Sequence, residues 1–209
     1  MTKTQKIGVT YKEFCLAEGS QHIASEFAIL KLQELVESFY IINILEVGLG
    51  IGAIAGSLLT VNKNIEYTGT EDNEFCLKAL KQNLPGNFKR IKLYPGINYL
   101  DQIARFDVVI IDGKDFGLQQ LNQILSPNGI IAIEGDRKEQ QEEMQRIFPN
   151  HLYVHCISLK KNKDYSPFPN SHWQGGIKVI FVDPDWKQKM WWVNEKLKTK
   201  LKYLFRKLG

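Results

Sequence analysis

The sequence has few cysteines, and they are not paired in any known motif. Cys15, Cys76 and Cys156 are far apart and form no CxxC motif. Disulfide-rich domains and zinc modules use closely spaced sets of cysteines. The sequence therefore predicts neither a disulfide framework nor a zinc site, and we expect the three thiols to be small core residues.

Long apolar runs are also missing. The longest ones, such as FDVVIID and GIIAIEG, fall far short of the roughly 20 residues that a helix needs to cross a bilayer. The first residues, MTKTQKIGVTYKEF, lack the apolar stretch of a secretory signal. The chain also shows no internal repeat or low-complexity tract. We therefore expect a cytoplasmic protein.

The composition predicts one globular domain followed by a basic tail. The chain has 209 residues, of which 44% are hydrophobic and 24% charged, enough for one sizeable core. Residues 186–209 contain eight Lys or Arg and one Glu, whereas residues 1–185 contain 19 basic and 22 acidic side chains. We therefore separate a domain at 1–185 from a tail at 186–209. The slightly acidic domain argues against a nucleic-acid partner.

Helical and strand periodicities alternate along most of the chain. The runs IINILEVG, 65–69, 90–94, FDVVIIDG and GIIAIEG read as strands. We expect helices ending near residue 39, after the glycines that follow residue 47, and near residues 74–83, 98–104, 118–125 and 138–148, with a turn at SPNG. Strands that are apolar throughout are typical of a parallel sheet covered on both faces. This order predicts a doubly wound, Rossmann-like α/β fold.

The end of the domain departs from this alternation. HLYVHCISL and GIKVIFVDP are strand-like runs with no helix between them, so we expect them to pair antiparallel across the connector at residues 161–176. With this ending, and with a helix before the first strand, residues 19–184 resemble the class I S-adenosylmethionine-dependent methyltransferases. The resemblance implies a mostly parallel sheet with a terminal antiparallel pair.

The stretch ILEVGLGIGA places three glycines directly after the first strand. Gly48, Gly50 and Gly52 allow a sharp turn and let a nucleotide-like ligand approach the backbone. Gly48, Gly50 and Ala53 also satisfy a dinucleotide fingerprint, which leaves an NAD-dependent oxidoreductase as an alternative. The methyltransferase pattern is acid-x-G-x-G-x-G, and the resemblance implies that Glu46 faces the cationic methionine end of S-adenosylmethionine. A carboxylate there would repel a pyrophosphate.

Further cofactor residues are expected at the next two strand ends. In IEYTGTED, Glu71 lies about 20 residues after the glycines, where a carboxylate accepts hydrogen bonds from ribose hydroxyls, and Asp72 is the alternative. Many members of the family carry an acid near the adenine, but YPGINYL offers Ile97 and Asn98 instead. We expect apolar contact from Ile97 and a hydrogen bond at Asn98.

Acidic residues follow the two central apolar strands. Asp112 ends FDVVIID, and Glu134 and Asp136 end IIAIEGD. Catechol-type O-methyltransferases hold magnesium at these strand ends, and oxygen ligands suit that cation. The family's signatures differ from IDGK and EGDR, so the alternatives for these three residues are a Mg²⁺ site and solvated turns.

Methyl transfer to a hydroxyl requires a group that receives its proton. Asp112 is the first candidate, and His172 in NSHWQGG is the second, since the connector should pass over the carboxyl ends of the strands. The alternative for His172 is a surface loop. The connector also offers residues for an aromatic and basic substrate wall, namely Tyr165, Phe168, Trp173, Lys161 and Lys163. His22, His151 and His155 are expected to be structural.

These features favour an S-adenosylmethionine-dependent methyltransferase that acts on a small molecule. We expect O-methylation of a sugar, glycan-precursor or phenol hydroxyl, ahead of N-methylation. The competing hypothesis from another class is a cofactor-binding or interaction protein with the same fold and no turnover. An oxidoreductase is the third.

The tail WKQKMWWVNEKLKTKLKYLFRKLG has the pattern of an amphipathic basic helix. One face gathers the apolar residues Met190, Val193, Leu197, Leu201, Leu204 and Leu208. This stripe packs either on the domain or on the partner of a homodimer, with the lysines in solvent. The other hypothesis is peripheral contact with an anionic membrane at its inner face, with the tryptophans near the headgroups.

Overall fold

The structure is a computed structural model that describes residues 1–101, 103–115 and 117–208, with residue 208 described by its backbone alone. The helices are α1 Lys3–Cys15, α2 Glu26–Phe39, α3 Ala53–Val61, α4 Glu74–Asn83, α5 Leu121–Ile124, α6 Lys138–Ile147 and α7 Trp186–Leu208, and single 3-10 turns are η1 Ser20–His22, η2 Phe88–Arg90, η3 Ile97–Tyr99 and η4 Leu118–Gln120. The strands are β1 Asn43–Val47, β2 Glu66–Thr70, β3 Ile91–Tyr94, β4 Phe106–Ile111, β5 Leu125–Glu134, β6 Leu152–Cys156 and β7 Ile177–Phe181.

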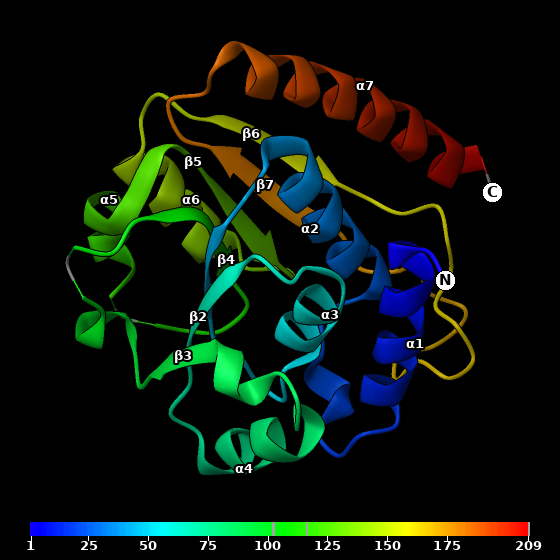
Figure 1. Cartoon of the computed structure of the whole chain (residues 1–209). Helices are drawn as coiled ribbons and strands as arrows, with labels where there is room; N and C mark the ends of the chain where they lie inside the picture. Colours follow the sequence, from blue (N-terminus) through cyan, green and yellow to red (C-terminus); the bar gives the residue numbers. More distant parts are fainter. Residues whose placement is uncertain (102, 116, 209) are drawn as a thin grey trace.

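The seven strands form one sheet in the order β3-β2-β1-β4-β5-β7-β6 (Figure 1). Strands β1 to β5 run parallel, and β7 is antiparallel to both of its neighbours, β5 and β6. The strand order reverses direction between β1 and β4, which opens a crevice outside their carboxyl ends. The predicted doubly wound sheet with its terminal antiparallel pair is confirmed.

Helices cover both faces of the sheet, and each face has its own core. On one face, α1, α2 and α3 pack on side chains such as Ile44 of β1 and Ile110 of β4. On the other, η4, α5 and α6 pack on Leu45 and Ile111. Neighbouring residues of a strand point to opposite faces, so a strand buried on both sides is apolar throughout. This arrangement explains the continuous apolar runs of β4 and β5.

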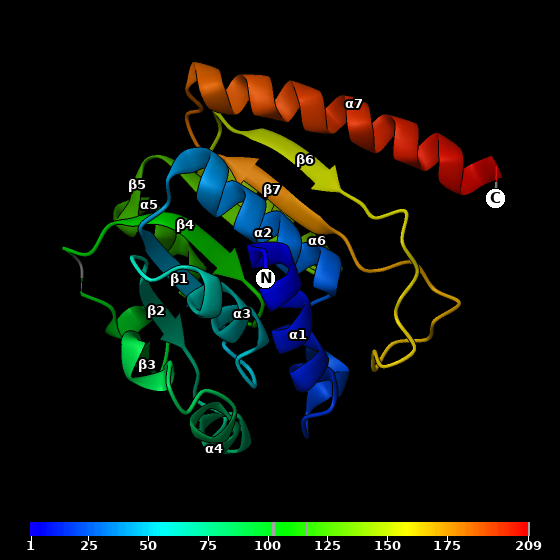
Figure 2. The ribbon, with the colours of Figure 1, turned by 45° about the vertical axis from the view of Figure 1, so that its right-hand side comes forward.

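Helix α7 covers the edge strand β6 (Figure 2). An uncovered edge would leave unpaired backbone groups open to other chains. Trp192 Nε1 donates to the Tyr153 carbonyl oxygen of β6 at 2.8 Å. Among the described residues, no helix is both long enough and apolar enough to cross a membrane.

Two local predictions differ from the structure. The predicted turn at SPNG lies inside β5, where Asn128 has a φ of 58° and the pairing with β4 shifts register near Phe106. Of the helix predicted near residues 98–104, the described residues form only the turn η3, because the backbone of Leu100 is extended and its side chain enters the second core, and residue 102 lies outside the described part. The other predicted elements are found within a few residues.

Candidate active site

The glycine turn joins β1 to α3 and has the backbone that the sequence predicts. Gly48, Gly50 and Gly52 have φ values of 85°, 53° and 93°, a region that side-chain-bearing residues rarely adopt. A Cβ at Gly48 would lie 2.4 Å from the Cα of Gly113 in the turn after β4. A Cβ at Gly50 would meet nothing within 4 Å. Gly48 is therefore required by packing, whereas Gly50 faces open space.

That open space is a cavity of about 260 Å³ at the carboxyl ends of β1, β2 and β4. Its walls include Gly50 and Ile51 of the turn, Asn73 at the start of α4, Asp112 after β4, and His22 of η1. Asn73 caps α4 by accepting a hydrogen bond from the Cys76 N–H at 3.1 Å. Residues 19 and 21–23, which precede α2, also line this cavity and close the space that the glycine turn opens.

Glu71 fixes the rim of this cavity. Its Oε2 accepts a hydrogen bond from the Gly50 N–H at 2.8 Å, and its Oε1 accepts from the N–H groups of Asp72 and Asn73 at 3.1 and 2.9 Å. A carboxylate has about four acceptor positions, so one remains for a ligand hydroxyl. The side chain of Asp72 is exposed. Glu71 is the better placed of the two for the predicted ribose contact.

Glu46 lies behind the turn and not in the cavity wall. Its side chain is fully buried, and its Oε2 accepts a hydrogen bond from the Tyr67 hydroxyl at 2.5 Å. Burial raises the pKa of Glu46 to about 8. Its other oxygen has no hydrogen-bond partner among the described residues. Direct contact with a cofactor stays a prediction, and this geometry does not favour it.

The two residues predicted at the adenine have other roles in the structure. Ile97 is 1% exposed and belongs to the second core, so its side chain offers no ligand surface. Asn98 is exposed and its Oδ1 accepts a hydrogen bond from Gln120. Asp115, which the sequence analysis missed, receives the N–H groups of Ile97 and Gly117 at 3.1 and 2.6 Å. An acid in the loop after β4, in IDGKDFG, was the available signal.

Asp112 and Glu134 form a pair of carboxyl groups at the ends of β4 and β5. The two side chains lie close enough to influence each other's protonation. Burial raises the pKa of Asp112 well above its ordinary range, and the charge of Glu134 raises it further. Burial also raises the pKa of Glu134. Two like charges in contact cannot both ionise easily, so the pair keeps a shared proton where isolated carboxyl groups would have lost theirs.

Arg137 lies against this pair. Its guanidinium is 3.3 Å from the Asp112 carboxylate and also donates to the Asp112 carbonyl oxygen, and its Nε donates to the Glu134 carbonyl oxygen at 2.9 Å. The positive charge opposes the rise in both pKa values. The cation therefore limits how tightly the pair holds its proton.

The third predicted metal ligand is not with the other two. The Asp136 carboxylate is fully exposed and lies 3.7 Å from the Lys178 ammonium. The described part of the chain contains no group of three or more His, Cys, Asp or Glu side chains that could hold a metal ion. Arg137 already contacts the Asp112 carboxylate and the Glu134 carbonyl oxygen, which places a cation beside the two carboxyl groups that do come together. The donor set present does not fit a magnesium centre.

A second cavity of about 350 Å³ adjoins the first and shares residues 21–23 with it. Glu134, Phe168, His172 and Trp173 line it, so the connector passes over the carboxyl end of β5 as expected. The predicted substrate wall is only partly assembled. Phe168 and Trp173 line the cavity, the Lys161 ammonium lies 3.8 Å from the Trp173 ring centre, Tyr165 packs against the first core, and Lys163 is exposed.

His22, predicted to be structural, is a candidate site residue. It lines both cavities. The available signal was the polar run GSQH, which precedes the helix cap Ser25 and crosses the strand ends. The other two lie elsewhere: His151 Nδ1 is 2.7 Å from the Phe148 carbonyl oxygen, and the ring of His155 is 3.3 Å from the Tyr203 hydroxyl.

No protein-family model and no curated protein matches the sequence, whereas many solved structures resemble the fold. A SAH-bound methyltransferase from Podospora anserina has a TM-score of 0.60 at 16% identity, covering 83% of this chain and 86% of its own. The O-methyltransferase TomG of Streptomyces achromogenes, involved in tomaymycin synthesis and solved with SAM, gives 0.59 at 12% identity, covering 87% and 90%. An O-methyltransferase from Bacillus cereus in complex with SAH gives 0.57 at 15% identity, covering 86% and 90%. Identities this low show a shared fold alone.

Proposed function

Since the chain has the class I methyltransferase fold, we propose that it is an S-adenosylmethionine-dependent methyltransferase that acts on a hydroxyl of a small molecule. One observation carries this proposal. Asp112 lines the cavity at the glycine turn, and the neighbouring Glu134 lines the cavity under the connector. A methyl donor in the first cavity and an acceptor in the second would meet at this pair.

Each residue then has a specific task. Gly50 admits the cofactor to the first cavity, and Glu71 offers its free acceptor position to a ribose hydroxyl. When bound, S-adenosylmethionine supplies a methyl group on a cationic sulfur, and the electrons of that bond return to the sulfur. The Asp112–Glu134 pair receives the proton that the hydroxyl loses as its oxygen binds the methyl carbon. A base whose pKa is raised by burial suits this transfer.

The size of the second cavity supports a small molecule as the methyl acceptor. A cavity of about 350 Å³ is at the lower end of the range for small-molecule sites. Phe168 and Trp173 suit the apolar face of a phenol or sugar ring, and His172 offers a polar contact. The structural neighbours named as O-methyltransferases support oxygen as the acceptor atom. Because the donor set does not fit magnesium, we expect turnover to survive excess chelator.

Calorimetry tests the cofactor site. The parent chain should bind S-adenosylhomocysteine and not NADH. Gly50→Val should abolish binding, because the side chain would enter the cavity. Gly135→Val is the matched control, since Gly135 also has a positive φ, of 73°, and a Cβ there also meets nothing within 4 Å but lies outside this cavity. Tight binding by Gly50→Val, with its fold checked by circular dichroism, would remove the glycine turn from the site.

A second experiment separates an enzyme from a binding protein of the same fold. Labelled methyl transfer is measured against a panel of phenols, sugars and amines. Glu71→Ala should weaken cofactor affinity by about 1.5 to 3 kcal/mol, the loss expected for hydrogen bonds to a charged group. Cofactor binding with no turnover on any acceptor would favour the non-catalytic hypothesis.

A further inference from the structure

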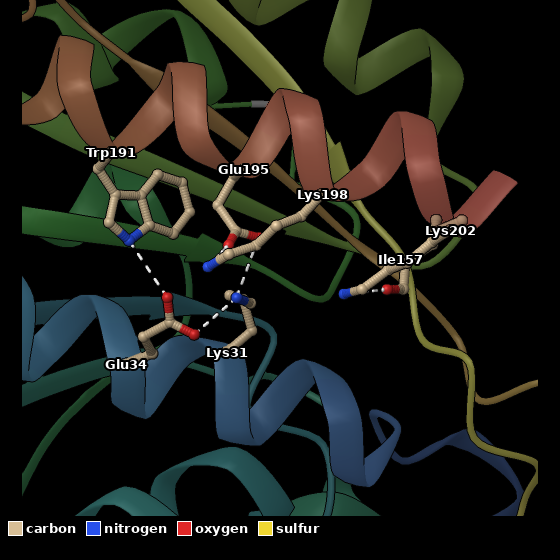
Figure 3. A network of polar contacts seen from close by, with 7 residues as sticks. All are labelled: Lys31, Glu34, Ile157, Trp191, Glu195, Lys198 and Lys202. Carbon is tan, nitrogen blue, oxygen red and sulfur yellow. Dashed lines mark hydrogen bonds and ion pairs between the residues drawn. The ribbon is translucent and has the colours of Figure 1, made fainter. Parts of the chain in front are cut away.

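Helix α7 is attached to the domain through its polar side. Glu195 and Thr199 are buried beneath it, and Glu195 pairs with the buried Lys31 of α2 at 3.1 Å (Figure 3). Lys202 Nζ donates to the Ile157 carbonyl oxygen at 2.9 Å, and Arg206 donates to that of Ser158. Hydrogen bonds and an ion pair, together with Trp191 and Trp192, hold this helix in place.

The apolar stripe of α7 therefore points away from the domain. We call its described members, all exposed by 43% to 63%, the outer stripe: Met190, Val193, Leu197, Leu201 and Leu204. Trp186 and Phe205 are also exposed on this helix. Leu208, the last predicted member, lies outside the described side chains. Both views show α7 as the outermost element on its side of the molecule (Figures 1 and 2). The prediction that the stripe packs on the domain is wrong.

Basic side chains border the outer stripe on both sides. At 100° per residue, Lys189, Lys196 and Lys200 lie along one border, and Lys187 lies along the other, whereas Lys198 pairs with the buried Glu195 at 2.8 Å. The Lys196 ammonium is 4.5 Å from the Trp192 ring centre, and that of Lys187 is 4.6 Å from the Tyr40 ring centre. The one acid of the helix, Glu195, is buried on the opposite side. The outward half of α7 is thus apolar at its centre and cationic at its borders.

Charge distinguishes the two partners that could cover the outer stripe, namely a second copy of the chain and an anionic membrane. A second copy of the chain would bring its own exposed Lys189, Lys196 and Lys200 against those of the first. Like charges at this spacing repel, and no described acid on the outward half offsets them. An anionic bilayer offers both apolar tails for the stripe and negative headgroups for the borders. We propose that α7 docks the protein on an anionic membrane surface, with the outer stripe in the headgroup region and the helix axis parallel to the bilayer.

The docking helix also contacts the second cavity. The Arg206 guanidinium is 5.2 Å from the ring centre of Trp173, and Trp173 lines that cavity with Glu134 and His172. At about 1.5 Å per residue the 23 residues of α7 extend roughly 35 Å, from the end of β7 to the connector. Docking along this length would place the connector beside the membrane. This inference does not require the proposed activity.

Vesicle co-sedimentation of the full chain tests the proposal. The chain is mixed with vesicles of phosphatidylcholine alone or with one quarter phosphatidylglycerol, at low and high salt. We expect sedimentation with the anionic vesicles at low salt, release at high salt, and little binding to neutral vesicles. A chain that ignores anionic vesicles at low salt would overturn the proposal.

Matched variants separate the stripe from charge alone. Leu197→Ser combined with Leu201→Ser should weaken vesicle binding by at least about tenfold, since two apolar side chains are lost from the interface and the charge is unchanged. Leu16→Ser is the control, because Leu16 is even more exposed but lies at the end of α1. Equal binding by the double variant and the parent would overturn the proposal. So would a parent chain that forms dimers in sedimentation velocity, loses them in the double variant, and binds no vesicles.

Discussion

Two polar clusters of this protein arrange their charges in opposite ways. At the strand ends, Asp112 and Glu134 are neighbouring acidic groups, and burial raises both pKa values. Between α2 and α7, Lys31 and Glu195 are opposite charges. Burial alone would lower the pKa of Lys31, but Glu34 and Glu195 raise it, while Lys198 and Lys31 lower that of Glu195 despite its burial.

The difference separates a candidate functional site from a structural contact between two helices. The Lys31–Glu195 cluster is satisfied in its charged form, faces no cavity that we describe, and connects two helices far apart in sequence. The carboxyl pair is satisfied only when it holds a proton, and it faces two cavities. A group that must hold a proton beside a ligand space is suited to exchange it. The first cluster stabilises the fold, whereas the second is poised for proton transfer.

The largest effect should come from Asp112→Asn. The amide cannot receive a proton, so turnover should fall about 100-fold to 10,000-fold, as for the loss of a general base. Stability at pH 7.5 should stay equal or rise, because the amide can donate a hydrogen bond to Glu134 without a second buried charge. Methyl-transfer assays measure turnover, and urea denaturation measures stability. Full activity in this variant would exclude Asp112 from proton transfer.

The next largest effect should come from Lys31→Met. Removing the cation leaves Glu195 buried with only Lys198, and unfolding free energy should fall by about 3 kcal/mol. Cofactor affinity of the folded protein should not change. Lys92→Met is the matched control, because the exposed Lys92–Glu66 pair should contribute less than about 1 kcal/mol.

A double variant sharpens this test. Lys31→Met combined with Glu195→Leu should recover most of the lost stability, because a buried ion pair is often replaced by apolar residues at little cost. If the double variant is less stable than Lys31→Met alone, the cluster is not the independent structural contact between α2 and α7 that we describe.

A smaller effect concerns Glu46 and pH. Its pKa is about 8 in the folded protein against an ordinary 4.5, so the folded state binds more protons between these values. Its contribution to stability is full below pH 4.5 and is lost as pH rises toward 8. Relative to Glu46→Gln, the parent should lose roughly 2 kcal/mol between pH 6 and 7.5, at about 1.4 kcal/mol per pH unit. If the curves of unfolding free energy against pH run parallel for the parent and Glu46→Gln, Glu46 is already ionised in the folded protein.

The smallest effect should come from Arg137→Gln. Removing a cation that lowers both pKa values of the carboxyl pair should move the acid limb of the pH–rate profile upward by about one pH unit. The rate at high pH should change little. Arg137→Lys, which keeps the charge, should shift the profile less. An unmoved limb would mean that the pair does not control the rate.

The sequence predicts the framework better than the site. Apolar runs such as FDVVIID identify strands buried on both faces, and the predicted α4 boundaries match the structure because Asn73 caps the helix and an apolar periodicity follows it. Strand ends also locate Asp112 and Glu134, since parallel strands place their carboxyl ends together. These features depend on local pattern and on the topology alone.

The misses depend on which way a side chain points. Ile97 and Asp136 lie near the predicted positions, but one turns into the core and the other into solvent. His22 enters the site because the segment before α2 crosses the strand ends, and no local pattern reports such a crossing. The prediction that the outer stripe packs on the domain fails for a related reason. Periodicity identifies an apolar helix face but does not indicate which surface covers it.

The bond from the Ser25 hydroxyl to the Gly175 carbonyl oxygen, 2.8 Å long, joins residues 150 positions apart. It ties the start of α2 to the connector, and the second cavity is enclosed by these two segments. During synthesis, nearly the whole domain must leave the ribosome before the two walls can meet. Contacts of such long sequence separation are slow to form. The acceptor cavity should thus be among the last features to appear during folding, after the glycine turn and its neighbouring strands have formed.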